Sequence, residues 1–322
     1  MDPITERVRD MYTRYPFPSK DKIGNELPGY LPNFIKRALD KRERHRIHIA
    51  KVVAQHLAGC EQPWRVLEAG CGTGETLCEI AQYIPDVALE AVDLSPTSIE
   101  RARQLLERKG FKGIVPIEHD LMQPLPFDAG RFDVISSIGV VHHLSDPVLG
   151  LRNLATCLAP GGHLLCYVYG QLGRRELLER REVVHLLAGQ EADFEKKIRT
   201  VEVLDLYPRH HRSRIKEFLY RSLGFDRTTT RNVWIVDQLA HIREKEYTIS
   251  LIQEDLAAAG LSLVEFHGFP NRIEEVITDE RILEDAKALS QQDRYRALEL
   301  LIRPSGYLFS ARLAVAKSES TG

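Results

Sequence analysis

A chain of 322 residues is long enough for one large α/β domain with additions, or for two small domains. Its hydrophobic content of 43% and charged content of 28% are ordinary for a globular enzyme, and no apolar run approaches the roughly 18 to 20 residues needed to span a bilayer. The net charge of −2 excludes a general electrostatic attraction to DNA or to an anionic membrane.

The five cysteines form no C-x-x-C pair, so neither a disulfide framework nor a zinc site is expected. The first residues, Met1 to Glu6, lack the basic and then apolar order of a signal peptide. These features favour a cytoplasmic protein without a metal.

The N-terminal region is predicted to be helical over residues 4–16, and the prolines of Tyr15-Pro16-Phe17-Pro18 end that helix. These aromatic residues predict either a plug over a pocket mouth or a surface strap that fills a groove. A long amphipathic helix is predicted over residues 34–57 after a loop. Its basic run, from Lys36 to Arg46, is either a solvated face or an anion-attracting rim.

The next segment combines an apolar strand beginning at Trp64, a glycine turn and a helix over residues 76–83. Gly70, Gly72 and Gly74 allow a sharp turn and leave no Cβ between the backbone and a ligand. A strand, a glycine turn and a helix N-terminus form the nucleotide-binding corner of an open α/β sheet.

The details of this turn distinguish between nucleotides. A dinucleotide fingerprint would place its third glycine at position 75, where this chain has Glu75. Glu68, at the end of the strand, would repel a pyrophosphate but suits a ligand with an ammonium and a sulfonium. The pattern Glu68-x-Gly70-x-Gly72-x-Gly74 therefore resembles the first motif of the class I S-adenosylmethionine-dependent methyltransferases.

Two further acidic residues follow predicted strands. Asp93 ends the strand of residues 88–93, near the spacing at which an acid accepts hydrogen bonds from ribose hydroxyls. Asp120 follows the strand of residues 114–118, and the resemblance implies that it accepts from the adenine amino group; alternatively, it caps a strand end. The predicted cofactor-binding residues are Glu68, Gly70, Cys71, Gly72, Gly74, Asp93, Leu94, Asp120, Leu121 and Ser137.

The resemblance continues through a fourth strand over residues 132–137, the segment Ile138 to Leu144, and a Pro-Gly-Gly turn before a fifth strand over residues 163–169. It covers Val66 to Gly170 in order. It implies a Rossmann-like, doubly wound seven-stranded sheet with an antiparallel last strand.

Beyond Gly170, residues 250–260 predict a helix, and residues 261–269 and 307–316 predict the last two strands. The insertion at 271–304 predicts two charged helices. The expected organisation is an N-terminal helical strap (1–60), the cofactor-binding core (61–170), a helical cap insertion (171–248) and the remainder of the core (249–317).

Methyl transfer needs the acceptor atom about 3 to 3.5 Å from the methyl carbon, and a base only if that atom carries a proton. His142 and His143 follow the fourth strand and are the candidate catalytic residues, because a neutral imidazole can take a proton. Alternatively, they bond the backbone at a helix start.

The predicted acceptor pocket suits a planar or carboxylate-bearing molecule, which an arginine could grip by two hydrogen bonds. Its expected residues are Tyr15, Phe17, Tyr169, Arg174, Arg175 and His241. Residues 137–140 lack the Pro-Pro-aromatic loop of enzymes that methylate base amino groups or glutamine amides, which argues against those substrates.

The leading interpretation is methyl transfer to an O, N or C atom of a small molecule, and a homodimer is one expected assembly. A protein or RNA methyltransferase is the alternative, with its substrate on the basic residues of the 171–248 insertion. A non-catalytic cofactor-binding scaffold is the third interpretation.

Overall fold

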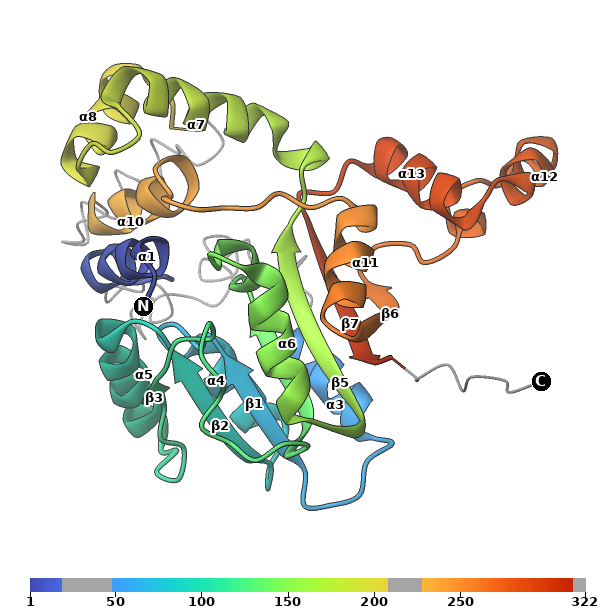
Figure 1. The fold of residues 1–322 in the computed structure, drawn as a ribbon, viewed down its shortest axis with the longest axis horizontal. Helices are drawn as coiled ribbons and strands as arrows, with labels where there is room; N and C mark the ends of the chain where they lie inside the picture. The colour runs from blue at the N-terminus through green and yellow to red at the C-terminus, as the bar shows by residue number, and fades with distance from the viewer. Residues whose placement is uncertain (19–47, 208–227, 315–322) are drawn as a thin grey trace, which may run out of the picture.

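The computed structural model describes residues 1–18, 48–207 and 228–314. Its centre is a seven-stranded sheet of order β3-β2-β1-β4-β5-β7-β6, in which β7 is antiparallel to both neighbours (Figure 1). This confirms the predicted Rossmann-like architecture. The strands are β1 (Arg65–Ala69), β2 (Ala88–Asp93), β3 (Ile117–Glu118), β4 (Phe132–Ile138), β5 (Leu158–Tyr169), β6 (Leu261–His267) and β7 (Gly306–Leu313).

Helices cover both faces of the sheet. The apolar residues of α3 (Ile49–Leu57), α4 (Glu75–Tyr83) and α5 (Pro96–Lys109) pack with Val66, Val134 and Leu165 on one face. The other face, with Leu67, Ile135 and Leu164, is covered by α6 (Pro147–Cys157), α11 (Ile249–Ala258) and α13 (Gln291–Ile302). Consecutive strand residues therefore enter opposite cores, as the pleat of a strand requires.

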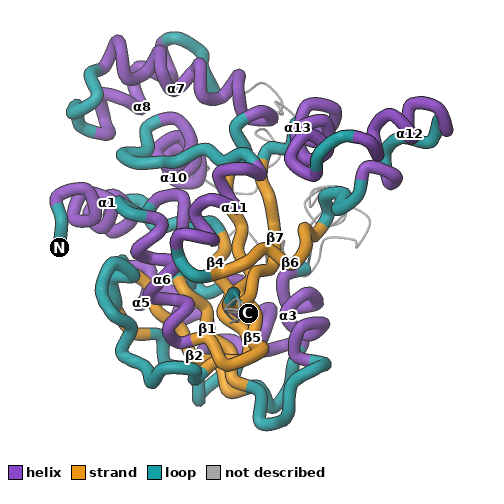
Figure 2. Tube along the Cα trace, turned by 45° about the vertical axis from the view of Figure 1, so that its right-hand side comes forward, coloured by secondary structure: helices purple, strands orange, loops and turns teal. Residues whose placement is uncertain are grey.

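A third apolar cluster joins the N-terminal helix to the insertion. Met11 of α1 (Pro3–Arg14) packs with Val184 of α7 (Arg175–Ala188), with α8 (Phe194–Val203), and with Ile235 of α10 (Thr228–Leu239). These helices lie together on the side toward which the parallel strands point (Figure 1), whereas α12 (Glu280–Ala288) lies away from the sheet (Figure 2).

Several element boundaries differ from the predicted ones. The strand β5 begins at Leu158 and runs through the expected Pro-Gly-Gly turn, because a register shift between Phe132 and Val134 absorbs the extra residues. The strand β3 is only two residues long. Helix α3 begins at Ile49, and the predicted helical residues 34–47 lie outside the described ranges. Within those ranges, no helix is long and apolar enough to cross a bilayer.

Candidate functional site

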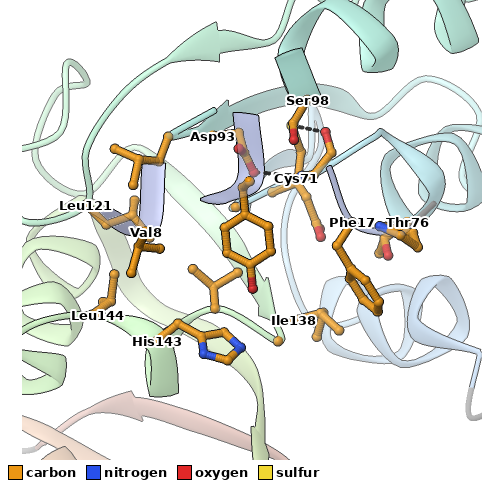
Figure 3. Close-up of a pocket in the computed structure, with 18 of the residues that line it drawn as sticks. Val8, Phe17, Cys71, Thr76, Asp93, Ser98, Leu121, Ile138, His143 and Leu144 are labelled. Atoms are coloured by element: carbon orange, nitrogen blue, oxygen red, sulfur yellow. Dashed lines mark hydrogen bonds between the residues drawn. The ribbon is translucent and has the colours of Figure 1, made fainter. Parts of the chain in front are cut away.

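A cavity of about 370 Å³ lies at the carboxyl ends of the strands, within the usual size range of small-molecule sites. Figure 3 shows Asp93 and Cys71 at one end and His143 at the other, with Val8 and Phe17 on opposite sides. The wall is formed by the glycine turn, the ends of β1, β2, β4 and β5, helices α1 and α10, and residues Phe17 and Pro18. Segments far apart in the sequence therefore meet around one space.

The glycine turn is held tightly at this cavity. Gly72 has a φ of +52°, and a Cβ there would lie 2.7 Å from the carbonyl oxygen of Phe17. Its N–H donates to Asp93 Oδ2 at 2.8 Å, and the Thr73 hydroxyl donates to the Pro18 carbonyl at 3.1 Å. Residues 17 and 18 thus lie directly on the turn, so both interpretations of the N-terminal aromatic segment are consistent with its position.

Three carboxyl groups line the same end of the cavity. Burial raises the pKa of Glu68 to about 8, and its buried Oε2 has no hydrogen-bond partner among the described residues. Asp120 accepts from the Met122 N–H through Oδ1, but its buried Oδ2 has no partner in the described part of the chain. Both oxygens of Asp93 accept backbone N–H bonds, and each retains a second lone pair; burial raises its pKa. Buried acceptors without partners are costly, so these oxygens indicate a ligand with donors.

The opposite end of the cavity is a polar cluster whose hydrogen atoms can be assigned from the backbone. The carbonyl of Arg243 can only accept, so His143 donates to it from Nδ1 (3.1 Å) and its Nε2 keeps a lone pair. The N–H of Arg243 can only donate, so His241 accepts it at Nδ1 (3.1 Å) and carries its proton on Nε2. One backbone unit therefore gives the two stacked rings, 3.8 Å apart, opposite tautomers.

The Nε2 proton of His241 begins a series of hydrogen bonds that leads to the cavity wall. His241 Nε2 donates to the Tyr12 oxygen (3.1 Å), and the Tyr12 hydroxyl donates to Asp237 Oδ1 (3.1 Å). Gln238 donates to the other oxygen of Asp237 and, at 2.9 Å, to the Tyr169 hydroxyl. Burial lowers the pKa of His143 to about 3 and raises that of Asp237. The cavity end is therefore lined by a neutral imidazole and one carboxyl group.

The arginine expected to grip a carboxylate is instead used inside the protein. Arg174 is 6% exposed, lies 3.0 Å from Glu244 and places its guanidinium 3.6 Å above the Tyr169 ring. Arg175 is exposed and pairs with Glu179 one helical turn away. Neither arginine lines the cavity, because Tyr169 stands between Arg174 and the space.

The remaining predicted acceptor and catalytic residues divide in the same way. Phe17, Tyr169 and His143 line the cavity, whereas His142 is fully buried next to it and His241 lies behind His143. Tyr15 packs against Phe194 and donates to Glu195, away from the cavity.

The predicted cofactor-binding residues mostly meet at the cavity. Two of the ten do not line it. A Cβ at Gly74 would instead meet Ala102 of α5, and the Ser137 hydroxyl donates to the Ala69 carbonyl. The residues brought to the cavity are Glu68, Gly70, Cys71, Gly72, Asp93, Leu94, Asp120 and Leu121.

Tyr12 and Asp237 were missed by reasoning from the sequence. Tyr12 follows Val8 by four positions on a helix, and both line the cavity. Asp237 directly follows the apolar run Val233 to Val236 and stands two positions before Leu239, and an acid in such surroundings is a signal for a buried charge. The basic residues 209–214 of the insertion lie outside the described part of the chain.

The comparisons agree with this geometry. A family model described as "Methyltransferase domain" matches residues 67–164, the segment from β1 into β5 that carries the glycine turn and the acidic strand ends. Residues 67–164 are a methyltransferase domain of the class I S-adenosylmethionine-dependent type.

The similarity of this methyltransferase to one relative extends beyond the matched domain. It is 29% identical over 309 residues to an uncharacterized protein of Synechococcus sp., which covers 93% of this chain and 69% of the relative. It is 31% identical over 100 residues to 27-O-demethylrifamycin SV methyltransferase of Amycolatopsis mediterranei, which covers 31% of this chain and 36% of that enzyme.

A solved structure has the same fold. PKMT2 of Rickettsia typhi, in complex with AdoHcy, matches 78% of this methyltransferase with a TM-score of 0.57 and 14% identity. The chain spans about half (49%) of that protein. At this identity, the likeness concerns the fold alone.

Proposed function

We propose that this methyltransferase transfers a methyl group from S-adenosylmethionine to a hydroxyl or amine of a small molecule. The observation that carries the proposal is a single cavity with unpartnered acid oxygens at the glycine turn and a neutral histidine, a tyrosine and a carboxyl group at the other end. The named O-methyltransferase relative supports a small-molecule acceptor.

The residues at the glycine turn fit the cofactor. Glu68 suits an ammonium group, Asp93 has lone pairs for ribose hydroxyls, and Asp120 Oδ2 can accept from the adenine amino group. Gly70 and Gly72 leave the backbone open to close approach. When bound, S-adenosylmethionine supplies a methyl group on a sulfonium, which is already an activated leaving group.

The other end is proposed to hold the acceptor and receive its proton. His143 Nε2 carries a lone pair because its Nδ1 is bonded to the backbone, and Asp237 can accept a hydrogen bond at the same end. A base with a low pKa is sufficient here, since the acidity of a hydroxyl or amine proton rises steeply as the new C–O or C–N bond forms. Tyr12 keeps Asp237 oriented.

The charges favour a neutral or cationic acceptor over the carboxylate expected from the sequence. Asp237 lines the cavity, and its charged form would repel a second carboxylate. The guanidinium that was expected to bind such a group, Arg174, is paired with Glu244 behind Tyr169. Phe17, Tyr12 and Tyr169 provide aromatic walls for a planar skeleton.

The test is a screen of small aromatic alcohols, amines and matched carboxylic acids, with formation of S-adenosylhomocysteine as the readout. Once an acceptor is found, Asp237→Asn and Tyr12→Phe should lower its turnover at least tenfold while cofactor affinity stays within about threefold. Arg175→Ala is the control, because Arg175 is exposed and does not line the cavity. Preferential turnover of carboxylic acids, or normal turnover by Asp237→Asn, would contradict the proposed acceptor site.

A further inference from the structure

A second polar cluster lies on the sheet face covered by α3, among residues that do not line the cofactor cavity. The His56 ring of α3 stacks on His163 of β5 at 4.4 Å and meets His267 of β6 edge-on at 5.4 Å. Among the described residues, His56 Nε2, His163 Nδ1, His267 Nε2 and the Ser310 hydroxyl are all buried without a hydrogen-bond partner. Four such atoms on one patch are unusual, because a buried polar group without a partner is costly.

The local structure of β6 brings its two polar side chains to this face. Leu261 and Leu263 face the core on the opposite side of the sheet, and so does Phe266, three residues later. An irregularity between Leu263 and Glu265 changes the phase of the strand. As a result, Glu265 and His267, two residues apart, both face α3, and Glu265 pairs in register with Ser310.

We propose that His56, Glu265 and His267 bind a divalent metal ion, with zinc as the best match. Their ligand atoms lie within 4.8 Å of one another. Two imidazole nitrogens, one carboxylate oxygen and an open fourth position form a common zinc ligand set. A tetrahedral ion needs ligand atoms about 3.4 Å apart, which is less than the 4.8 Å within which these atoms lie. Rotation of the exposed Glu265 side chain can bring its carboxylate closer to the two rings.

The position of the cluster would let the ion join two elements of the fold. His56 lies in α3, next to β5, whereas Glu265 and His267 lie on the β6 edge, with β7 between the two strands (Figure 2). A shared ion would fasten α3 to this edge strand. His163 is left out of the ligand set and holds the His56 ring in place by stacking.

The polar end of the cofactor cavity is a poorer metal site, although His143, Asp237 and His241 also converge there. His241 already accepts a backbone N–H at Nδ1, so its Nε2 carries the proton and has no lone pair to give a metal. By contrast, the facing nitrogens of His56 and His267 have no partner among the described residues.

The experiment uses the full chain without a histidine tag, dialysed against a chelator and then desalted. Zinc is titrated in competition with a chromophoric chelator, and cobalt(II) is added separately for its visible absorption. We expect saturable 1:1 zinc binding, intense cobalt bands typical of tetrahedral coordination, and a melting temperature that rises with zinc. His56→Ala and His267→Ala should each weaken zinc binding at least tenfold, with circular dichroism to verify folding.

Two matched variants make the test decisive. His163→Phe keeps a stacking ring but removes its nitrogens, so zinc affinity should stay within about threefold. His143→Ala alters the competing cluster and should also leave zinc affinity unchanged. The proposal is overturned if the wild type shows no saturable binding, if His267→Ala binds zinc as wild type does, or if His143→Ala alone abolishes binding.

Discussion

The buried arginine beside Tyr169 allows a sharp test of stability, because its neighbour in sequence is exposed. Arg174→Ala removes a guanidinium that is 6% exposed, and Arg175→Ala removes one that is 75% exposed. Breaking a buried pair costs roughly 3–5 kcal/mol when it strands a charge. Glu244 would keep Arg181 at 2.6 Å, which favours the low end, while the lost contact with Tyr169 adds about 2 kcal/mol.

We therefore expect Arg174→Ala to lower the free energy of unfolding by about 3–5 kcal/mol. With an unfolding entropy of about 2.1 cal/mol/K per residue, this corresponds to a melting temperature about 4 to 7 °C lower. Arg175→Ala, which loses only a surface pair, should stay within about 0.5 kcal/mol. Urea unfolding followed by circular dichroism measures both. Equal stability of the two variants would show that Arg174 is not used as a structural ion pair.

Three further outcomes follow from the cofactor end. At pH 7 the Glu68 carboxyl, with its pKa of about 8, is mostly protonated, so binding a cationic ammonium should release close to one proton. Calorimetry in buffers of different ionisation enthalpy measures this release. The Glu68→Gln variant should release no proton. Because this folded-state pKa lies above the unfolded value of about 4.3, Glu68 should lower the free energy of unfolding progressively as pH rises from about 4 to 8. In urea unfolding at several pH values, Glu68→Gln should lack this contribution to the pH dependence of stability. Gly72→Val should abolish cofactor binding measured by calorimetry, since a Cβ at position 72 would lie 2.7 Å from the Phe17 carbonyl. Gly113→Ala, whose Cβ would lie in open space, should bind the cofactor normally.

The parts of the fold set by local patterns were predictable. The strand β2 has its predicted bounds, and the order of strands follows from the glycine turn, the acidic strand ends and the resemblance over Val66 to Gly170. These signals are contained within short stretches of chain. Eight of the ten predicted cofactor-binding residues therefore meet at one cavity.

The end of the cavity at His143 could be predicted only in part, because it depends on contacts between distant segments. Arg174 and Arg175 look alike in sequence, but Arg174 is buried against Tyr169 and against Glu244, which lies 70 residues later, whereas Arg175 is exposed. Tyr12 reaches Asp237 across 225 residues. Position relative to a strand end was sufficient for His143 and Tyr169, but not for side chains supplied by packed helices.

The main chain at position 243 controls the proton on two rings at once. Its carbonyl fixes the tautomer of His143 and its N–H fixes that of His241, so the side chain at 243 could change freely without disturbing either. Proline would be the exception, because it lacks the N–H and would free His241 to exchange tautomers. The Tyr12 hydroxyl could then donate to His241 Nε2 instead of to Asp237, which reverses that one hydrogen bond and removes a donor from Asp237. The direction of these hydrogen bonds is thus set by the main-chain N–H and C=O of one residue, which nearly all substitutions leave intact.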